Sequence, residues 1–143
     1  PAVSLIFGLR AALKLMKKEG IDRVYARHDR MARATRAAAT ALGLKLLAPE
    51  HPSPAATGIW MPPGVDADQL LEYLRARMGL TLAEGQDHLR GKIIRIAHVG
   101  YMGAFDVVTA VAGLEMALKK FGHPAQLGKG VAAAQEILME ALP

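Results

Sequence analysis

One arginine in an apolar stretch is the residue of this sequence best placed to do chemistry. The segment Gly91-Lys-Ile-Ile-Arg-Ile-Ala-His-Val-Gly-Tyr101 predicts a strand in which Arg95 has aliphatic neighbours. Because alternate side chains of a strand share a face, Arg95 lies opposite Ile94 and Ile96. A guanidinium keeps its proton and is costly to bury unpaired, so Arg95 either reaches a surface or meets an anion. Its planar fork of donors suits a carboxylate or a phosphate. A structural ion pair with an internal acid is the alternative.

The remaining reactive side chains do not assemble into a catalytic or metal-binding motif. The histidines lack the H-x-x-x-H spacing and have no cysteine to assist them, so no metal site is predicted at His28, His51, His88, His98 or His123. Neither serine lies in a G-x-S-x-G nucleophile turn. The segment Gly128-Lys-Gly130 lacks the preceding strand and the spacing of a phosphate-binding loop.

Composition indicates one globular domain with a real core. The chain has 143 residues, of which 52% are hydrophobic and 22% charged. No apolar run approaches the roughly 18 residues of a membrane span, and the first residues do not resemble a signal peptide. The absence of cysteine fits a reducing compartment, and we expect a cytoplasmic protein. The absence of asparagine, with many arginines and alanines, suggests a heat-adapted source.

The basic charge has two interpretations. The net charge is +5, and five arginines recur every three or four residues along one side of a predicted helix, at Arg23, Arg27, Arg30, Arg33 and Arg36. Such a row could bind nucleic acid, but aromatic residues are only 5% of the chain, so a platform for stacking bases is missing. A solvated helix face is therefore favoured, and no nucleic-acid partner is expected.

Hydrophobic periodicity and turn residues predict nine elements. Helices are expected at 4–19, 22–42, from Asp66, at 105–121 and at 130–141, and strands at 44–47, 57–61, 80–83 and 91–99. Asp66 can cap its helix with Gln69 as the capping-box partner, and the helix at 105–121 is expected to bury Leu114 and Met116. The order predicts an α+β fold, a small and mostly antiparallel sheet of three or four strands covered by helices.

Four segments together resemble a known family. The segment Pro1–Leu9, the loop Gly85–Lys92, the Arg95 strand with Gly100-Tyr101, and Asp106-Val107 are similar, in the same order, to the C-terminal part of class V aminotransferases. This is the serine–pyruvate and alanine–glyoxylate group of the fold-type I, pyridoxal phosphate-dependent enzymes. The resemblance covers nearly the whole chain. It implies that residues 21–143 are the C-terminal small domain, and that residues 1–20 are a linking helix toward a large domain absent from the sequence.

The resemblance also implies a function. In the family, the arginine at the position of Arg95 binds the α-carboxylate of the amino-acid or 2-oxo-acid substrate. The enzyme would move an amino group between a small amino acid, such as serine or alanine, and pyruvate or glyoxylate. Pyridoxal phosphate and its Schiff-base lysine belong to the absent large domain, so no catalytic, cofactor-binding or metal-binding residue is assigned here. We expect a homodimeric parent enzyme, and an isolated chain that is inactive and self-associates through its exposed linking helix.

A different class of function stays open. The chain could be a stand-alone α+β module that binds a ligand or another protein, and a natural gene beginning at Pro1 would favour that reading. Some relatives of the family carry a hydrogenase-subunit name. Nothing in this sequence supports that chemistry, since it has no cysteine and no set of metal ligands.

Overall fold

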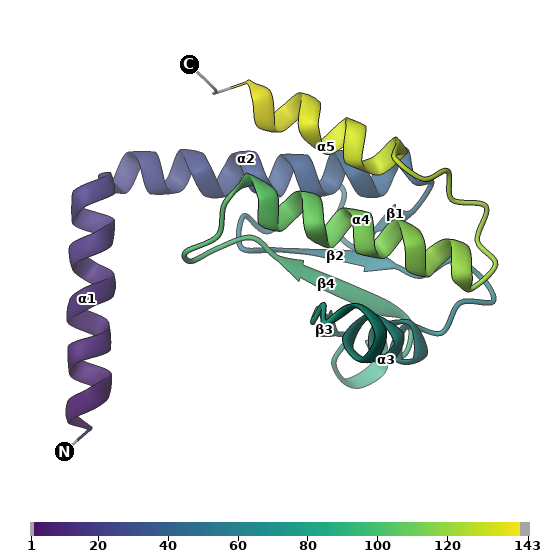
Figure 1. The fold of residues 1–143 in the computed structure, drawn as a ribbon, viewed down its shortest axis with the longest axis horizontal. Helices are drawn as coiled ribbons and strands as arrows, with labels where there is room; N and C mark the ends of the chain where they lie inside the picture. Colours follow the sequence, from purple (N-terminus) through teal and green to yellow (C-terminus); the bar gives the residue numbers. More distant parts are fainter. Residues whose placement is uncertain (1, 141–143) are drawn as a thin grey trace.

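The computed structural model describes residues 2–140 as helices packed on one small sheet (Figure 1). The elements are α1 (Val3–Glu19), α2 (Ile21–Ala41), β1 (Lys45–Leu46), β2 (Ala56–Trp60), α3 (Ala67–Met78), β3 (Ala83–Glu84), a 3-10 turn (Asp87–Leu89), β4 (Ile93–Ala97), α4 (Ala104–Lys120) and α5 (Lys129–Met139). Pro1 and residues 141–143, which include the end of the last predicted helix, lie outside the described residues.

The four described strands form one antiparallel sheet in the order β1-β2-β4-β3. The strand that carries Arg95 is therefore internal, with Gly58 of β2 opposite Arg95 on one side and Ala83 of β3 on the other. Strand pairs of this kind fix the direction in which each side chain points. The predicted α+β fold with a small antiparallel sheet is confirmed.

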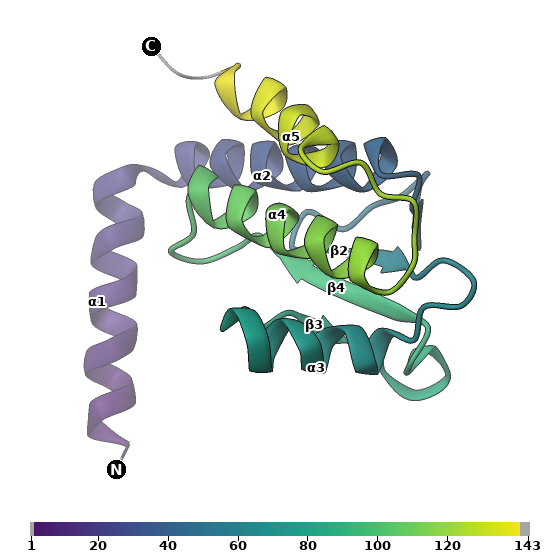
Figure 2. The same cartoon turned by 45° about the vertical axis from the view of Figure 1, so that its right-hand side comes forward.

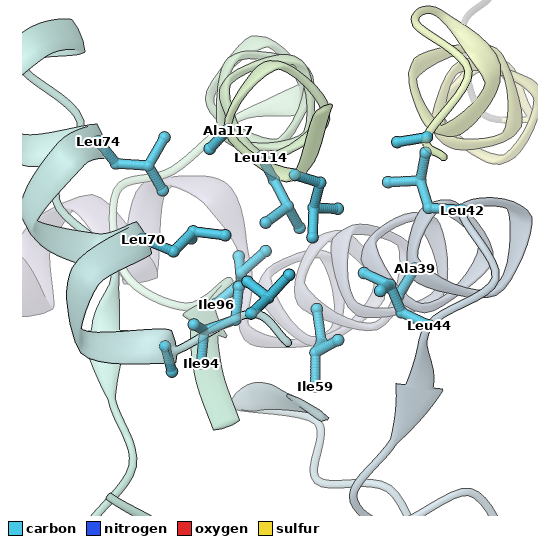
Figure 3. Close-up of a cluster of buried hydrophobic side chains, with 14 of the residues drawn as sticks. Ala39, Leu42, Leu44, Ile59, Leu70, Leu74, Ile94, Ile96, Leu114 and Ala117 are labelled. Carbon is cyan, nitrogen blue, oxygen red and sulfur yellow. The ribbon is translucent and has the colours of Figure 1, made fainter. Parts of the chain in front are cut away.

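The core lies between one face of the sheet and the helices. Ile59, Ile94 and Ile96 are almost fully buried, and they meet Leu70 of α3 and Leu114 of α4 in one apolar cluster (Figure 3). In both views α4 runs between α2 and α3, and α5 lies beside α2 (Figures 1 and 2). Because the burial of apolar area drives packing, this face of the sheet is committed to the core. The opposite face of the sheet, which carries Arg95, is more exposed to solvent.

Two glycines and one aspartate set the helix ends. Asp66 caps α3, since its Oδ1 accepts a hydrogen bond from Gln69 N at 2.9 Å, as predicted. Gly79 ends the same helix in the left-handed conformation that glycine adopts at little cost. Gly20, at φ 91°, separates α1 from α2. No residue of α1 is buried, and the helix projects away from the rest of the chain (Figures 1 and 2).

Two sequence-based expectations are wrong in detail. The strand predicted at 80–83 is displaced to Ala83–Glu84, because Leu80 N still bonds to Leu74 O and so completes the end of α3. In α4, Met116 is 46% exposed and Glu115 is only 3% exposed. The reason is that the Glu115 carboxylate caps α5. It accepts hydrogen bonds from Gly128 N at 2.7 Å and Gly130 N at 2.6 Å.

Candidate functional site

Arg95 lies in the middle of β4, on the side of the sheet away from the core. Its side chain is half-buried, and its Nε donates a hydrogen bond to the backbone oxygen of Glu84 at 2.9 Å. That bond fixes the near end of the guanidinium. No ion pair between Arg95 and a carboxylate forms among residues 2–140, so the internal salt bridge that the sequence left open is not found there. The terminal nitrogens of Arg95 remain available to an anion.

Room beside Arg95 is created by a glycine on the neighbouring strand. Gly58 faces Arg95 across the β2–β4 ladder, and a Cβ at this position would lie 3.0 Å from both Cβ and Cδ2 of Leu47. A larger residue would therefore push Leu47 away or fill the space beside Arg95. The sequence did not predict that Gly58 lies opposite Arg95 or next to Leu47, because both contacts depend on the register of the strands.

Two hollows border Arg95 on opposite sides. The first, of about 550 Å³, lies between α3 and β3 and is lined by residues that include Asp68, Glu72, Arg75 and Arg90. Arg75 pairs with Glu72, and Arg90 Nε lies 3.4 Å from Asp68 Oδ2. Arg75 and Arg90, the other two arginines of this hollow, are thus already paired with carboxylates. Arg95 alone of the three arginines there has no acidic partner.

The second hollow, of about 240 Å³, lies beneath the loop that joins β1 to β2. Its polar lining consists of Arg36, Ser53, Thr57 and Arg95, and its lining includes no acidic residue. Arg36 comes from α2, where the sequence placed it on a solvated face. The structure instead buries its Nη1 without a hydrogen-bond partner among the described residues. The second hollow is therefore lined by two arginine residues and by no acidic residue, and most of its surface is apolar.

His98 directly follows the last residue of β4 and contacts Thr57, which lines the second hollow. It is fully buried, and its Nε2 is 3.0 Å from Thr57 Oγ1. Burial lowers the pKa of His98 below its ordinary value of 6.5, and the positive charge of Arg36 lowers it further. The imidazole is accordingly held in its neutral form, where it supports the wall of the hollow.

Arg27 holds the loop that follows the Arg95 strand. Its Nη1 donates to the backbone oxygens of Gly100 at 3.0 Å and Met102 at 2.8 Å, while Nε donates to Glu19 Oε1 at 2.6 Å. The hydrogen bond to Glu19 raises the pKa of Arg27, and the same bond lowers the pKa of the Glu19 carboxyl. The half-buried His28 lies 3.3 Å from the same Gly100 oxygen.

The role of Arg27 was missed in the sequence. It was grouped with the arginines of a solvated face, and that grouping is wrong for Arg27 and for Arg36. The only usable signal was Glu19, eight residues earlier, at the end of the preceding helix. Because Gly20 separates the helix of Glu19 from the helix of Arg27, the eight-residue spacing did not predict that the two side chains meet.

The residues of this chain do not form a site for an aldehyde cofactor such as pyridoxal phosphate. Such a site needs a lysine in a pocket, but all eight lysines are exposed, and none lines either hollow beside Arg95. Within residues 2–140, no group of three or more acidic or histidine side chains is gathered as metal ligands would be. No helix in this part of the chain is long and apolar enough to span a bilayer.

Comparisons with known proteins place the chain beside aminotransferases. The serine–glyoxylate aminotransferase of Arabidopsis thaliana is 37% identical over 145 residues, which cover 100% of this chain and 36% of that protein. A protein named "Soluble hydrogenase, small subunit", from Synechococcus sp., is 43% identical over 143 residues, covering 99% and 37%. No family model matches.

A solved structure agrees with the sequence relatives. The crystal structure of pyridoxamine–pyruvate aminotransferase from Mesorhizobium loti superposes with a TM-score of 0.91 at 37% identity, covering 96% of this chain and 36% of that one. The chain thus spans about 36% of the length of the aminotransferases it matches. The predicted resemblance to the class V aminotransferases is confirmed, and it extends over about a third of their length.

Proposed function

We propose that this chain, whose relatives are class V aminotransferases, is the small domain of such an enzyme. Residues 21–143 would be the domain itself, and residues 1–20 the helix that links it to a large domain. The enzyme would transfer an amino group between a small amino acid and a 2-oxo acid such as glyoxylate or pyruvate. The relatives named for glyoxylate and pyruvate support the acceptor class. One observation carries the proposal, namely an internal-strand arginine that has no acidic partner among the described residues.

Arg95 would bind the substrate carboxylate. Its Nε is already held by Glu84 O, which orients the guanidinium plane before any substrate arrives. The terminal nitrogens can then form two parallel hydrogen bonds with a carboxylate, a pairing stronger and more directional than a single bond. A substrate anchored at its acid end has its amino or oxo group at a fixed distance from the guanidinium, which is the entropic advantage of binding before reaction. Arg95 would thus be a substrate-positioning residue.

The proposed cofactor is pyridoxal phosphate. It supplies an electron sink for the Cα carbanion of the substrate. The residues of this chain do not fit it, so the groups that bind it, including the Schiff-base lysine, would belong to the large domain. We therefore expect the isolated 143-residue chain to be inactive. A homodimeric parent enzyme in the cytoplasm is part of the same proposal.

The hydrogenase name of one relative suggests other chemistry. Iron–sulfur clusters and nickel or iron centres are commonly held by thiolates, and these 143 residues contain no cysteine. The chemical group that this chain does offer is the guanidinium of Arg95, which suits a carboxylate. The proposal accordingly follows the aminotransferase names.

The test is steady-state kinetics of the full-length enzyme with Arg95→Lys and Arg95→Ala. Loss of a bidentate carboxylate pair should raise KM and lower kcat/KM by about 100-fold for the alanine variant, with lysine a partial substitute. Arg23→Ala, an exposed arginine of α2, is the matched control and should leave both constants unchanged. An Arg95→Ala enzyme with unaltered KM and kcat/KM would refute the assignment.

A further inference from the structure

The guanidinium of Arg95 is oriented by the backbone of a very short strand. Its Nε donates to Glu84 O at 2.9 Å, and Glu84 is the second of the two residues of β3. This strand lies at the edge of the sheet beside β4, and both of its residues are exposed. An exposed edge strand of two residues has little of its own to hold it in place. The position of Glu84 O therefore depends on the segment that follows β3.

The next residue, Gly85, is packed tightly against that segment. Gly85 is buried, although Glu84 and Gln86 on either side of it are exposed. Its N–H donates to Ile93 O at 3.2 Å and so extends the pairing of β3 with β4. A Cβ at this position would overlap with Leu89 O and would lie 2.7 Å from Leu89 C and 2.9 Å from Ile93 Cγ1. Glycine is the residue that permits so close an approach to another backbone.

The turn against which Gly85 packs is itself held in place. Leu89 O accepts a hydrogen bond from Lys92 N at 3.1 Å. The adjacent Gly91 O accepts one from the backbone N–H of the first residue of α3, also at 3.1 Å. Leu89 O cannot retreat without loss of these bonds, and a backbone atom cannot rotate aside as a flexible side chain can. A larger residue at position 85 would instead displace β3, the exposed side of the contact.

We infer that Gly85 is a positioning residue for Arg95, because its lack of a side chain lets β3 lie where Glu84 O orients the guanidinium. The inference rests on the proposed function, since it takes Arg95 as the residue that binds the substrate carboxylate. Gly85 acts through Glu84 O and does not touch the substrate. If β3 is displaced, the guanidinium plane tilts, and a carboxylate forms one hydrogen bond with it in place of two parallel ones.

Kinetics of the full-length enzyme with L-serine and glyoxylate test the consequence for the substrate. Gly85→Ala should raise KM about tenfold, the loss of one of two charge-assisted bonds, with kcat less affected. In an enzyme that already carries Arg95→Ala, the same change should raise KM no further, because both residues act through one group. Gly130→Ala is the control for lost stability. A Cβ there would lie 2.9 Å from Leu42 Cδ1, so this variant should melt at lower temperature with KM unchanged.

Hydrogen exchange of the Arg95 Nε–H group, followed by NMR on the 143-residue chain, tests the positioning without any substrate. In the wild-type chain this proton should exchange about tenfold more slowly than that of the exposed Arg23, because it is bonded to Glu84 O. Gly85→Ala should remove the protection. Gln86→Ala, at the exposed neighbouring position, and Gly130→Ala should both retain it.

A second pair of variants decides the matter if Gly85→Ala does not fold. Asp87 lies in the same turn and has a φ of 49°, in the left-handed region that glycine adopts readily and alanine does not. Asp87→Ala should therefore strain the turn and reduce the protection of the Arg95 Nε–H in part. Asp87→Gly removes the same carboxylate without strain and should preserve the protection.

The remaining outcomes overturn distinct statements. Unchanged protection of the Arg95 Nε–H in Gly85→Ala, or in Asp87→Ala if only that variant folds, would refute the inference. A rise in KM that is equal in Gly85→Ala and Gly130→Ala, or equal with and without the Arg95 side chain, would refute it too and leave the role of Arg95 intact. Unaltered KM in Arg95→Ala would instead refute the proposed function, and the exchange rates would still decide whether Gly85 positions Arg95.

Discussion

Among single residues, His98 couples the stability of the domain to pH. Its imidazole is fully buried, and its pKa lies below 6.5 because burial and the charge of Arg36 disfavour the protonated form. In the unfolded chain this side chain takes up a proton at higher pH than in the folded one. Its contribution to stability is therefore complete above pH 6.5 and is lost as the pH falls from there through the lowered pKa.

We predict that the melting temperature falls between about pH 7.5 and about pH 5.5, where carboxylates have not yet titrated. His98→Gln keeps a hydrogen-bonding group beside Thr57 and cannot titrate, so its melting temperature should vary less across that range. His51→Gln, at an exposed position, is the control and should follow the wild type. Parallel pH curves for wild type and His98→Gln would show that the imidazole is not the responsible group.

Glu115 is the residue whose role most contradicts its type. A buried carboxylate is normally costly, but this one accepts backbone N–H groups at the start of α5, including Val131 N at 3.0 Å. The Gly128-Lys-Gly130 segment, which sequence patterns excluded as a phosphate loop, is thus an anion-binding turn that uses an internal acid. A helix prediction by apolar periodicity selects Met116 at this point and has no means of anticipating the cap.

We predict that Glu115→Ala lowers the free energy of unfolding by about 2–4 kcal/mol, because it leaves buried backbone donors unpaired. Glu115→Gln retains one acceptor oxygen and should lose about half as much. Urea denaturation provides the measurement, with Glu136→Ala on the exposed face of α5 as the control. Equal losses in Glu115→Ala and Glu136→Ala would contradict the capping role.

At the scale of elements, Arg27 joins three of them. It lies on α2, pairs with the last residue of α1, and binds two backbone oxygens of the loop between β4 and α4. Hydrogen bonds from a charged donor to backbone oxygens restrain a loop more than a surface ion pair restrains two side chains. The path of the chain after Arg95 therefore depends on a residue far away in sequence.

We expect Arg27→Ala to cost about 1–2 kcal/mol of unfolding free energy through the lost bonds to Gly100 and Met102. Hydrogen exchange should become faster in the loop of residues 99–102 and in the last turn of α1, and remain unchanged in α3. Arg27→Lys keeps the charge but cannot reach three partners at once, so it should behave nearly as the alanine variant. Faster exchange throughout the chain, rather than in these two segments, would argue against a local clamp.

Local patterns predicted the elements better than their contacts. The apolar stripe of α2, the Asp66 cap and the alternation that sets Arg95 against Ile94 were all readable, because each depends on neighbours within a few residues. The displaced β3, the cap by Glu115 and the burial of Arg36 were not, because each depends on a partner from another element. At the candidate site, Arg95 could be predicted from the sequence, whereas the second hollow beside it could not, because residues of several elements line it.

For the whole molecule, α1 is the part that the fold leaves unpartnered. Its large apolar side chains are exposed, among them Phe7, Leu9 and Leu13. An apolar surface of this kind promotes association in water. Since no residue of α1 is buried, the helix contributes little to the core of residues 21–140.

We predict that the 143-residue chain self-associates, and that a chain lacking residues 1–19 is monomeric with a melting temperature within a few degrees of the original. Leu9→Lys and Leu13→Lys should each weaken the association, whereas Ala11→Lys adds the same charge while removing little apolar area. Sedimentation velocity across a concentration series is the measurement. A monomer at all concentrations for the 143-residue chain would contradict the prediction.

Gly20 is the single residue between α1 and α2, so the direction of α1 depends on the backbone angles of this one glycine. A helix of 17 residues is about 25 Å long, so a turn of about 10° at Gly20 sweeps its far end through about 4 Å. Glu19, next to this glycine, is bonded to Arg27, which also donates to the backbone oxygens of Gly100 and Met102 after the Arg95 strand. A rotation of α1 about Gly20 would therefore act on the loop after the Arg95 strand through the Glu19–Arg27 pair.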